Sequence, residues 1–325
     1  MDRKLGTTIV ALLLVFVVTV TAEAQDKPYK GTYLKIITSQ AGGGWYPHAG
    51  AMASIWEKYL PGLVASAQTS AGVHENLVLL QKKQVEIAFL NPEYTYDMYH
   101  GIGNYTGKMY KGIRHLFNIM GGPFHIMTLP GSGIETMSDV RGKRFGRALV
   151  GHASDIAVDG IMDVYGIKKD EVKFQRYGRQ DMADAIKDKQ IDAGLFQINL
   201  QAPVIMDLIS VHKAKIVPVA GDYKKKILEK YPYYADFPIP KEAYRLAKDV
   251  ESFGVIAFVG VDASMDEKLA YALTKTYFEH IGEISKIYVP ADELTQAGVK
   301  GAVRSVIVPL HPGAQRYLKE QGVVK

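Results

Sequence analysis

The chain has 325 residues, 47% of them hydrophobic, with no cysteine and a formal net charge of +5. Without cysteine it has neither disulfides nor a lipid-modified N-terminal cysteine, so its stability must come from a sizeable core, and a chain of this length usually divides into two domains. Lys and Arg are mixed with Asp and Glu along the chain, which disfavours a nucleic-acid-binding surface and is at most a mild sign of an anionic ligand.

Residues 1–24 have the pattern of a signal peptide. Arg3 and Lys4 precede an apolar run over residues 9–20, and small residues lead up to Ala24. A membrane span needs about twenty apolar residues, so cleavage after Ala24 is predicted, with an uncleaved anchor helix as the alternative. A secreted protein without a lipid anchor needs a second membrane to retain it, which favours the periplasm.

The remaining chain alternates short apolar runs with segments of helical periodicity, which predicts an α/β protein with largely parallel sheets. Residues 34–37 are typical of a strand, residues 39–47 form a glycine-rich loop, and residues 49–59 have helical spacing. Glycines between a strand and a helix allow a tight turn with exposed amide groups.

A weak repeat indicates two similar units. Residues 76–91 and residues 182–197 each contain an amphipathic helix, a turn with glutamine and a short strand. The two strands end near an amide, Asn91 in the first copy and Gln197 in the second. Chance similarity of two βα units is the alternative. If the repeat is real, each copy belongs to one lobe, and the ligand site lies beyond the carboxyl ends of the strands.

Two apolar runs, residues 124–129 and residues 253–259, are candidates for strands that cross between the lobes. They predict a two-lobed binding-protein fold of the type II kind, with a cleft and a hinge. The first lobe is predicted to be discontinuous, over 30–127 plus 255–325, and the second to span 128–254.

Several motifs, taken in their order along the chain, resemble one family. The chain is similar to the TAXI-subfamily solute receptors of tripartite ATP-independent periplasmic (TRAP) transporters. No single motif is diagnostic, and the collinear order over nearly the whole mature chain makes the match specific. The matching segments are Gly42-Gly43-Gly44-Trp45-Tyr46-Pro47, Glu75-Asn76-Leu77 with Leu79-Leu80, Ser132-Gly133-Ile134 through Arg144, Lys189-Gln190-Ile191-Asp192-Ala193, Ala272-Leu273-Thr274-Lys275 and Leu310-His311-Pro312-Gly313-Ala314.

The resemblance implies a receptor that delivers a small organic anion to a permease driven by an ion gradient. Relatives in that subfamily bind glutamate, 2-oxoglutarate or similar dicarboxylates. The chain departs from the family pattern at Ser39-Gln40-Ala41 and at Gly151-His152-Ala153-Ser154, where the ligand is expected. The resemblance therefore supports the class of protein more firmly than the ligand.

The expected pocket holds an anion through free backbone N–H groups at helix N-termini. Ser154 or Asp155 is the expected N-cap of the second-lobe helix, with ligand contact and capping alone as alternatives for Ser154. Tyr46 is favoured for ligand contact over core packing, and Trp45 less so. For the amides Asn91, Gln197 and Asn199, structural hydrogen bonding is as open as ligand contact. For His152, which should be neutral, a role as a surface loop residue is equally open. The predicted ligand-binding residues are Gly43, Gly44, Trp45, Tyr46, Ser70, Asn76, Asn91, Arg147, His152, Ser154, Asp155, Gln197 and Asn199.

Among cations, Arg147 is the leading candidate for a bidentate carboxylate clamp, with a surface role as the alternative. Arg176 and Arg179 are weaker candidates for that role. No serine-hydrolase elbow, metalloprotease motif or phosphate loop is present, and the histidines lack metal-ligand spacing. We therefore expect a monomeric binding protein rather than an enzyme, with no cofactor, metal or nucleic acid. A ligand-sensing partner of a membrane kinase and a periplasmic enzyme on the same scaffold are the alternatives.

Overall fold

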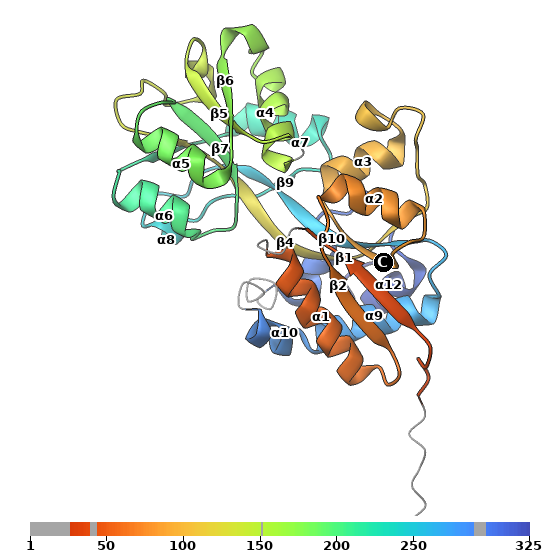
Figure 1. Cartoon of the computed structure of the whole chain (residues 1–325). Helices are drawn as coiled ribbons and strands as arrows, with labels where there is room; N and C mark the ends of the chain where they lie inside the picture. The colour runs from red at the N-terminus through yellow and green to blue at the C-terminus, as the bar shows by residue number, and fades with distance from the viewer. Residues whose placement is uncertain (1–26, 40–43, 151, 289–296) are drawn as a thin grey trace, which may run out of the picture.

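The computed structural model describes residues 27–39, 44–150, 152–288 and 297–325. The predicted signal peptide and Gly43 lie outside the described residues. The described chain forms two α/β lobes joined by long strands that belong to both (Figure 1). This arrangement confirms the predicted two-lobed fold class.

The first lobe is built on three parallel strands in the order β2-β1-β3. Its strands are β1 (Tyr33–Ile37), β2 (Val64–Gln68) and β3 (Ile87–Leu90). Its helices are α1 (Trp45–Tyr59), α2 (Val73–Gln81), α3 (Pro92–His100), α9 (Glu267–Glu279), α10 (Ile281–Ile287) and α12 (Pro312–Glu320), with 3-10 turns η1 (Gly103–Tyr105) and η5 (Gly298–Val303).

The second lobe repeats the parallel arrangement in the order β7-β5-β6. Its strands are β5 (Arg144–Ala148), β6 (Lys173–Tyr177), β7 (Ala193–Gln197) and β8 (Lys215–Val217). Its helices are α4 (Ala153–Val164), α5 (Arg179–Lys187), α6 (Pro203–Ser210), α7 (Gly221–Lys230) and α8 (Lys241–Tyr244), with 3-10 turns η2 (Met137–Val140) and η3 (Lys169–Glu171).

Two long antiparallel strands, β4 (Ile113–Thr128) and β10 (Phe253–Asp262), connect the lobes. The carboxyl-terminal half of β10 pairs with β3 in the first lobe. The end of β4 pairs with β7 and β8 in the second lobe, and the short strand β9 (Ala235–Asp236) pairs with the start of β10. Both apolar runs singled out in the sequence lie in or overlap these strands. Because β4 pairs in both sheets and β10 pairs with β3 and β9, the residue boundaries of the lobes stay a prediction.

The crossing strands are packed closely where glycines occur in both. A side chain at Gly121 would lie 2.8 Å from the carbonyl oxygen of Val255, and one at Gly122 would lie 2.7 Å from that of Ile198. A side chain at Gly254 would overlap the carbonyl of Gly122. Glycine therefore permits the backbones to approach at the point where the chain passes from one lobe to the other.

Each lobe has its own buried apolar clusters, which explains why the helices dock where they do. In the first lobe, Trp56 of α1 is fully buried, and its indole Nε1 donates to the carbonyl of Leu273 in α9 at 3.0 Å. In the second lobe, Ile161 of α4 and Phe145 of β5 are fully buried in one cluster. Among the described residues, no helix is both long and apolar enough to cross a bilayer.

Candidate functional site

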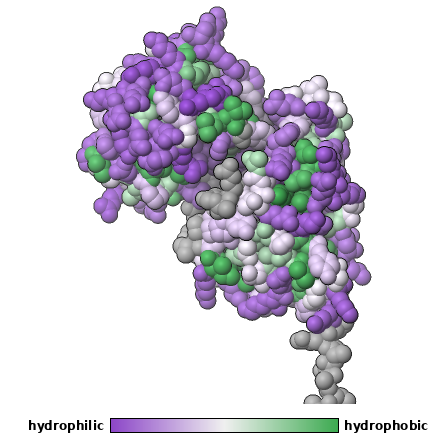
Figure 2. Space-filling view, viewed as in Figure 1, coloured by the Kyte–Doolittle hydropathy of each residue, from purple (hydrophilic) through white to green (hydrophobic). Residues whose placement is uncertain are grey.

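The parallel strands of both lobes lead at their carboxyl ends into the N-termini of helices. Such junctions expose backbone N–H groups and a partial positive charge, the usual place for an anion in an open α/β sheet. Figure 2 shows an indentation between the two lobes and a mostly hydrophilic surface over the second lobe. The junctions run from β1 to α1, β2 to α2, β3 to α3, β5 to α4, β6 to α5 and β7 to α6.

Asn76 and Ser70 stabilise the carboxyl ends of the strands in the first lobe. The buried Asn76 donates from Nδ2 to the carbonyl of Thr38 at 2.6 Å and to that of Phe89 at 2.9 Å, which ties the ends of β1 and β3 together. Ser70 donates to the same Thr38 carbonyl at 2.9 Å and accepts from the Gly72 N–H at 3.1 Å. Both predicted ligand residues therefore make structural hydrogen bonds in this edge.

Gly44 is the N-cap of α1, and the helix begins at Trp45, four residues before the predicted start. A side chain at Gly44 would overlap the hydroxyl of Tyr288, which sequence reasoning did not connect with this loop. Trp45 packs edge-on against Phe89 with ring centroids 5.9 Å apart. Tyr46 is exposed, so of the two aromatic residues it is the one available to a ligand.

The predicted amides lie at two of these junctions, β3 to α3 and β7 to α6. Asn91 is the N-cap of α3 and is partly buried. Gln197 is the last residue of β7, opposite Phe124 of β4, and Asn199 follows in the loop before α6. Asn91 and Gln197 lie at the carboxyl ends of strands, as the repeat predicts, and Asn199 lies two residues beyond Gln197.

Arg147 is buried beneath the first turn of α4 and is paired there with carboxylates of the chain. Its Nε donates to Asp155, and its Nη2 lies 3.2 Å from a carboxylate oxygen of Asp159 and 2.8 Å from the Asp155 carbonyl. Arg176 also pairs with Asp155, at 2.7 Å. In this structure the charge of Arg147 is therefore compensated, and the guanidinium holds α4 against β5.

The N-cap of α4 is His152, which corrects the expectation that Ser154 or Asp155 caps this helix. Ser154 and Asp155 are buried in the first turn instead. The pKa of His152 is lowered, first by partial desolvation and then by the positive charge of Arg179. The imidazole is therefore neutral near pH 7, as its position beside a helix N-terminus predicts.

Of the three candidate arginines at the strand ends of the second lobe, Arg179 has no carboxylate within ion-pair distance among the described residues. It is the first residue of α5, directly after the end of β6. Desolvation lowers its own pKa, and its charge acts on His152 of the neighbouring junction. The sequence favoured Arg147 over Arg179, because only the fold shows that Asp155 and Asp159 compensate the former.

The two lobes approach each other at α3. The ring of Tyr96 in α3 lies 5.5 Å from that of Tyr233, which follows α7. The pKa of Tyr94, also in α3, is raised mainly by burial and further by Asp155 of α4. Figure 1 likewise places α3 beside α4 and α7. The first turn of α4 therefore lies close to the first lobe, as a site shared by both lobes requires.

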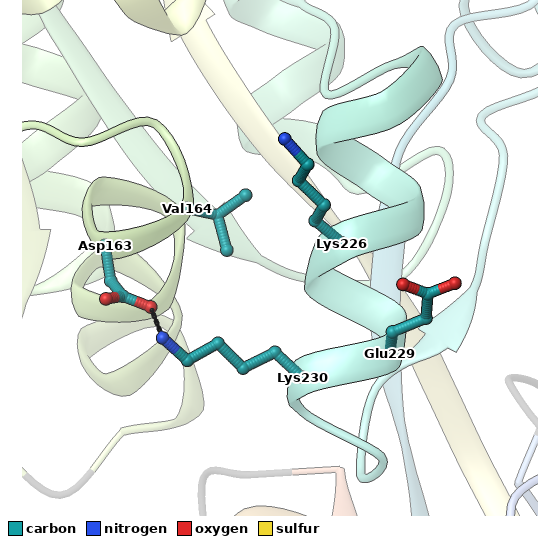
Figure 3. Close-up of a pocket in the computed structure, with 5 residues that line it drawn as sticks. All are labelled: Asp163, Val164, Lys226, Glu229 and Lys230. Carbon is teal, nitrogen blue, oxygen red and sulfur yellow. Dashed lines mark hydrogen bonds and ion pairs between the residues drawn. The ribbon is translucent and has the colours of Figure 1, made fainter.

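A cavity of about 410 Å³ lies elsewhere, at the carboxyl end of α4. It is lined by Asp163, Val164, Lys226, Glu229 and Lys230, and Lys230 reaches across to Asp163 at 2.6 Å (Figure 3). Since α4 has 12 residues, this cavity is separated from the His152 junction by about 18 Å of helix. Asp163 and Lys230 pair with each other, and the cavity is not part of the strand-end site. Among the described residues, no group of three or more His, Asp or Glu has the arrangement of a metal site.

The sequence profile of the NMT1-like family matches residues 36–322. The chain belongs to the NMT1-like family. Solved structures with the same fold include a TctC solute-binding protein from Polaromonas, which has 14% identity and a TM-score of 0.56 and for which the alignment covers 90% of this chain and 99% of that one. A Bordetella bronchiseptica protein has 14% identity, a TM-score of 0.51, and coverage of 90% and 98%.

A third solved structure, a Xanthomonas citri protein bound to ATP, has 12% identity, a TM-score of 0.50, and coverage of 90% and 97%. At these identities the three structures show a likeness in fold alone. This member of the NMT1-like family therefore has two lobes over nearly its full described length.

Proposed function

We propose that the chain is an extracytoplasmic solute-binding protein that captures a small organic anion between its lobes and delivers it to a membrane transporter. The observation that carries this proposal is Arg179, which stands without a carboxylate partner among the described residues at the N-terminus of α5, beside His152. A cation and a helix N-terminus at the same strand end attract a carboxylate together.

The two lobes offer different chemistry to such a ligand. On the second lobe, Arg179 supplies charge and the α4 and α5 termini supply N–H donors. On the first lobe, Tyr46 and Asn91 supply neutral hydrogen-bonding groups. A neutral His152 adds a directed donor or acceptor rather than a second full charge. The combination suits a small acid with further polar groups, such as a dicarboxylate or an amino acid.

The crossing strands supply the hinge for closure on the ligand. Because β4 and β10 are the long strands that run between the two lobes, a small change in their backbone angles rotates one lobe against the other. Closure would bring the α5 terminus towards the first lobe and exclude water from the anion.

The finer assignment follows the sequence resemblance. We propose the periplasm as the compartment, after cleavage of residues 1–24, and a monomeric receptor without enzymatic activity. We propose a TRAP permease as the partner and glutamate, 2-oxoglutarate or a similar dicarboxylate as the ligand. The predicted lobes 30–127 plus 255–325 and 128–254 are the bodies that move.

A thermal-shift screen tests the proposal. The protein from Gln25 onward is unfolded and refolded to remove carried-over ligand, and is then heated with a panel of organic acids and amino acids. A ligand at a thousand times its dissociation constant adds about 4 kcal/mol of stability, which corresponds to a rise of roughly 2–4 °C per kcal/mol for a chain of this size. A large shift with an acid that is recovered unchanged supports the receptor. The absence of a shift with every anion contradicts it, and an acid recovered chemically altered indicates an enzyme.

A further inference from the structure

Glu93 is a buried carboxyl group that the proposed ligand site does not use. It lies in the first turn of α3, directly after Pro92, and is 1% exposed. Neither of its carboxyl oxygens has a hydrogen-bond partner among the other described residues. Burying an ionised carboxylate without partners is strongly unfavourable, so such a group is normally neutral.

The surroundings of Glu93 come from both lobes. Tyr234, from the segment after α7, is 5% exposed, and its hydroxyl also lacks a hydrogen-bond partner in the described part of the chain. The Tyr234 ring lies 5.6 Å from Phe124 in β4 and 4.9 Å from Phe253 in β10. The charge of Glu93 contributes to the raised pKa of Tyr234, so Glu93 acts on a residue of the second lobe that is packed directly on the crossing strands.

The titratable groups around Glu93 are acids and phenols. Tyr94 and Asp97 belong to α3 itself, and Tyr233 and Tyr234 belong to the opposing segment. From the second lobe, the charge of Asp155 raises the pKa of Tyr94, and Asp159 and Tyr231 raise the pKa of Tyr234. Within the described residues, the charge that acts on Glu93 is the anion of Asp97.

Burial is the first cause that raises the pKa of Glu93, to about 8, and the negative charge of Asp97 adds to it. The backbone N–H of Glu93 itself lowers the pKa, but by less than burial raises it. An ordinary glutamate has a pKa near 4.3. The packed arrangement therefore holds a proton on Glu93 at neutral pH.

We propose that Glu93 is a proton-operated latch between the lobes. Protonated Glu93 allows α3 to pack against the segment of Tyr233 and Tyr234, and ionised Glu93 favours separation of these two surfaces, because the carboxylate is then hydrated. The latch acts through the protein's own contacts and needs no ligand, so it does not depend on the proposed transport function.

The direction of the pH effect follows from proton binding. Between the ordinary pKa of glutamate, about 4.3, and the raised value of about 8, the packed arrangement binds one proton more than the separated one. The ratio of packed to separated molecules therefore falls up to tenfold for each unit of pH rise in this window. Below and above this pH window, Glu93 has the same protonation state in both arrangements, so it no longer makes the ratio of packed to separated molecules depend on pH.

Distance measurements on the ligand-free protein test the latch. Since the chain has no cysteine, spin labels can be attached at Lys173→Cys on β6 and Lys319→Cys on α12, two exposed positions on different lobes. Pulsed electron paramagnetic resonance then gives the distance distribution at pH 6 and at pH 9.5. We expect the population of longer distances to increase at pH 9.5. The same distribution at both pH values overturns the proposal.

Two variants separate Glu93 from other titrating groups. Glu93→Gln keeps the shape of the protonated side chain and cannot ionise, so its distribution should be the same at both pH values. If this variant opens with pH as the labelled parent does, the proposal is wrong. Asp97→Asn removes the neighbouring anion and keeps Glu93, so the opening should move to lower pH. Opening at a higher pH in this variant contradicts the electrostatic basis of the latch.

Discussion

Arg147 and Asp155 form a buried ion pair that joins the end of β5 to the first turn of α4. Arg147 is 6% exposed and Asp155 is 8% exposed. Arg147 also donates to the backbone carbonyl of Asp155 at 2.8 Å, and Arg176 contacts the same carboxylate oxygen of Asp155. The pair fixes the direction of the α4 N-terminus, where the proposed anion site is located.

Replacing Arg147 should therefore lower stability more than the loss of an ordinary ion pair. Arg147→Met leaves Asp155 buried with one cation fewer, and removing one partner of a buried pair typically costs about 3–5 kcal/mol. Urea unfolding followed by circular dichroism measures the loss. The matched control is Arg316→Met, because Arg316 pairs with Glu267 on the surface and such pairs contribute about 0–1 kcal/mol. Equal losses in both variants would show that the buried pair is not structural.

Arg179 should contribute to anion binding rather than to stability. Arg179→Ala removes a cation that has no carboxylate partner among the described residues, so the free energy of unfolding should change little. A hydrogen bond to a charged group contributes about 1.5–3 kcal/mol, so affinity for the anion found in the screen should fall by roughly one to two orders of magnitude in calorimetric titration. Lys225→Ala, on the exposed face of α7, is the control. Unchanged affinity in Arg179→Ala would remove this residue from the site.

Three buried histidines predict loss of stability in acid. Burial lowers the pKa of His48 to about 3 and those of His115 and His125 to about 4. Below about pH 6.5 the unfolded chain binds protons that the folded chain excludes, so stability falls as pH decreases from 6.5 towards 4. Glu93 has the opposite sign, because its pKa is raised, and its contribution to stability falls as pH increases through its window.

The variant His115→Gln isolates one of these protons. Glutamine can still donate to the carbonyl of Ala302, which the imidazole Nε2 contacts at 3.2 Å. The slope of unfolding free energy against pH between 4.5 and 5.5 should decrease by about 1.4 kcal/mol per unit, the value for one proton. Urea titrations at these pH values give the slope. A slope equal to that of the parent would mean that His115 titrates normally in the folded protein.

The crossing of the strands should be intolerant of a single methyl group. Gly254→Ala places a side chain onto the carbonyl of Gly122, and overpacking of this kind typically costs about 1–3 kcal/mol. The control Gly282→Ala lies in α10, where an added methyl group meets nothing within 4 Å, so it should raise stability by about 0.5–1 kcal/mol. Thermal unfolding of both variants tests this contrast. Equal melting temperatures would show that the strands can separate freely at this point.

The internal repeat was the part of the fold that sequence predicted best. Lys83 and Lys189 both have left-handed backbone conformations, with φ of 56° and 55°. After each, the glutamine N–H donates back to the preceding helix, Gln84 to the Leu79 carbonyl and Gln190 to the Ala185 carbonyl. The same turn thus connects α2 to β3 and α5 to β7. Local patterns of this kind can be predicted from the sequence because neighbouring residues determine them.

Features that depend on partners distant in the chain could not be predicted from the sequence. Glu93 resembles an ordinary first-turn glutamate in the sequence, since Pro92 and an acidic residue are typical of a helix start. Glu93 acts electrostatically on Tyr233 and Tyr234, which are about 140 positions away. Likewise, Tyr288 reaches Gly44 only through the fold. For Arg147 the sequence placed the residue correctly at a strand end, but the pairing with Asp155 became visible only in the structure.

The central claim is that one anion is held by strand-to-helix junctions of both lobes. Amide chemical shifts of the deuterated, ¹⁵N-labelled protein, followed by NMR during titration with the anion from the screen, test it most directly. We predict shift changes at Tyr46 and Asn91 in the first lobe together with changes at His152 and Arg179 in the second. Changes confined to one lobe, or to the cavity around Lys226 and Lys230, would contradict a site shared between the lobes.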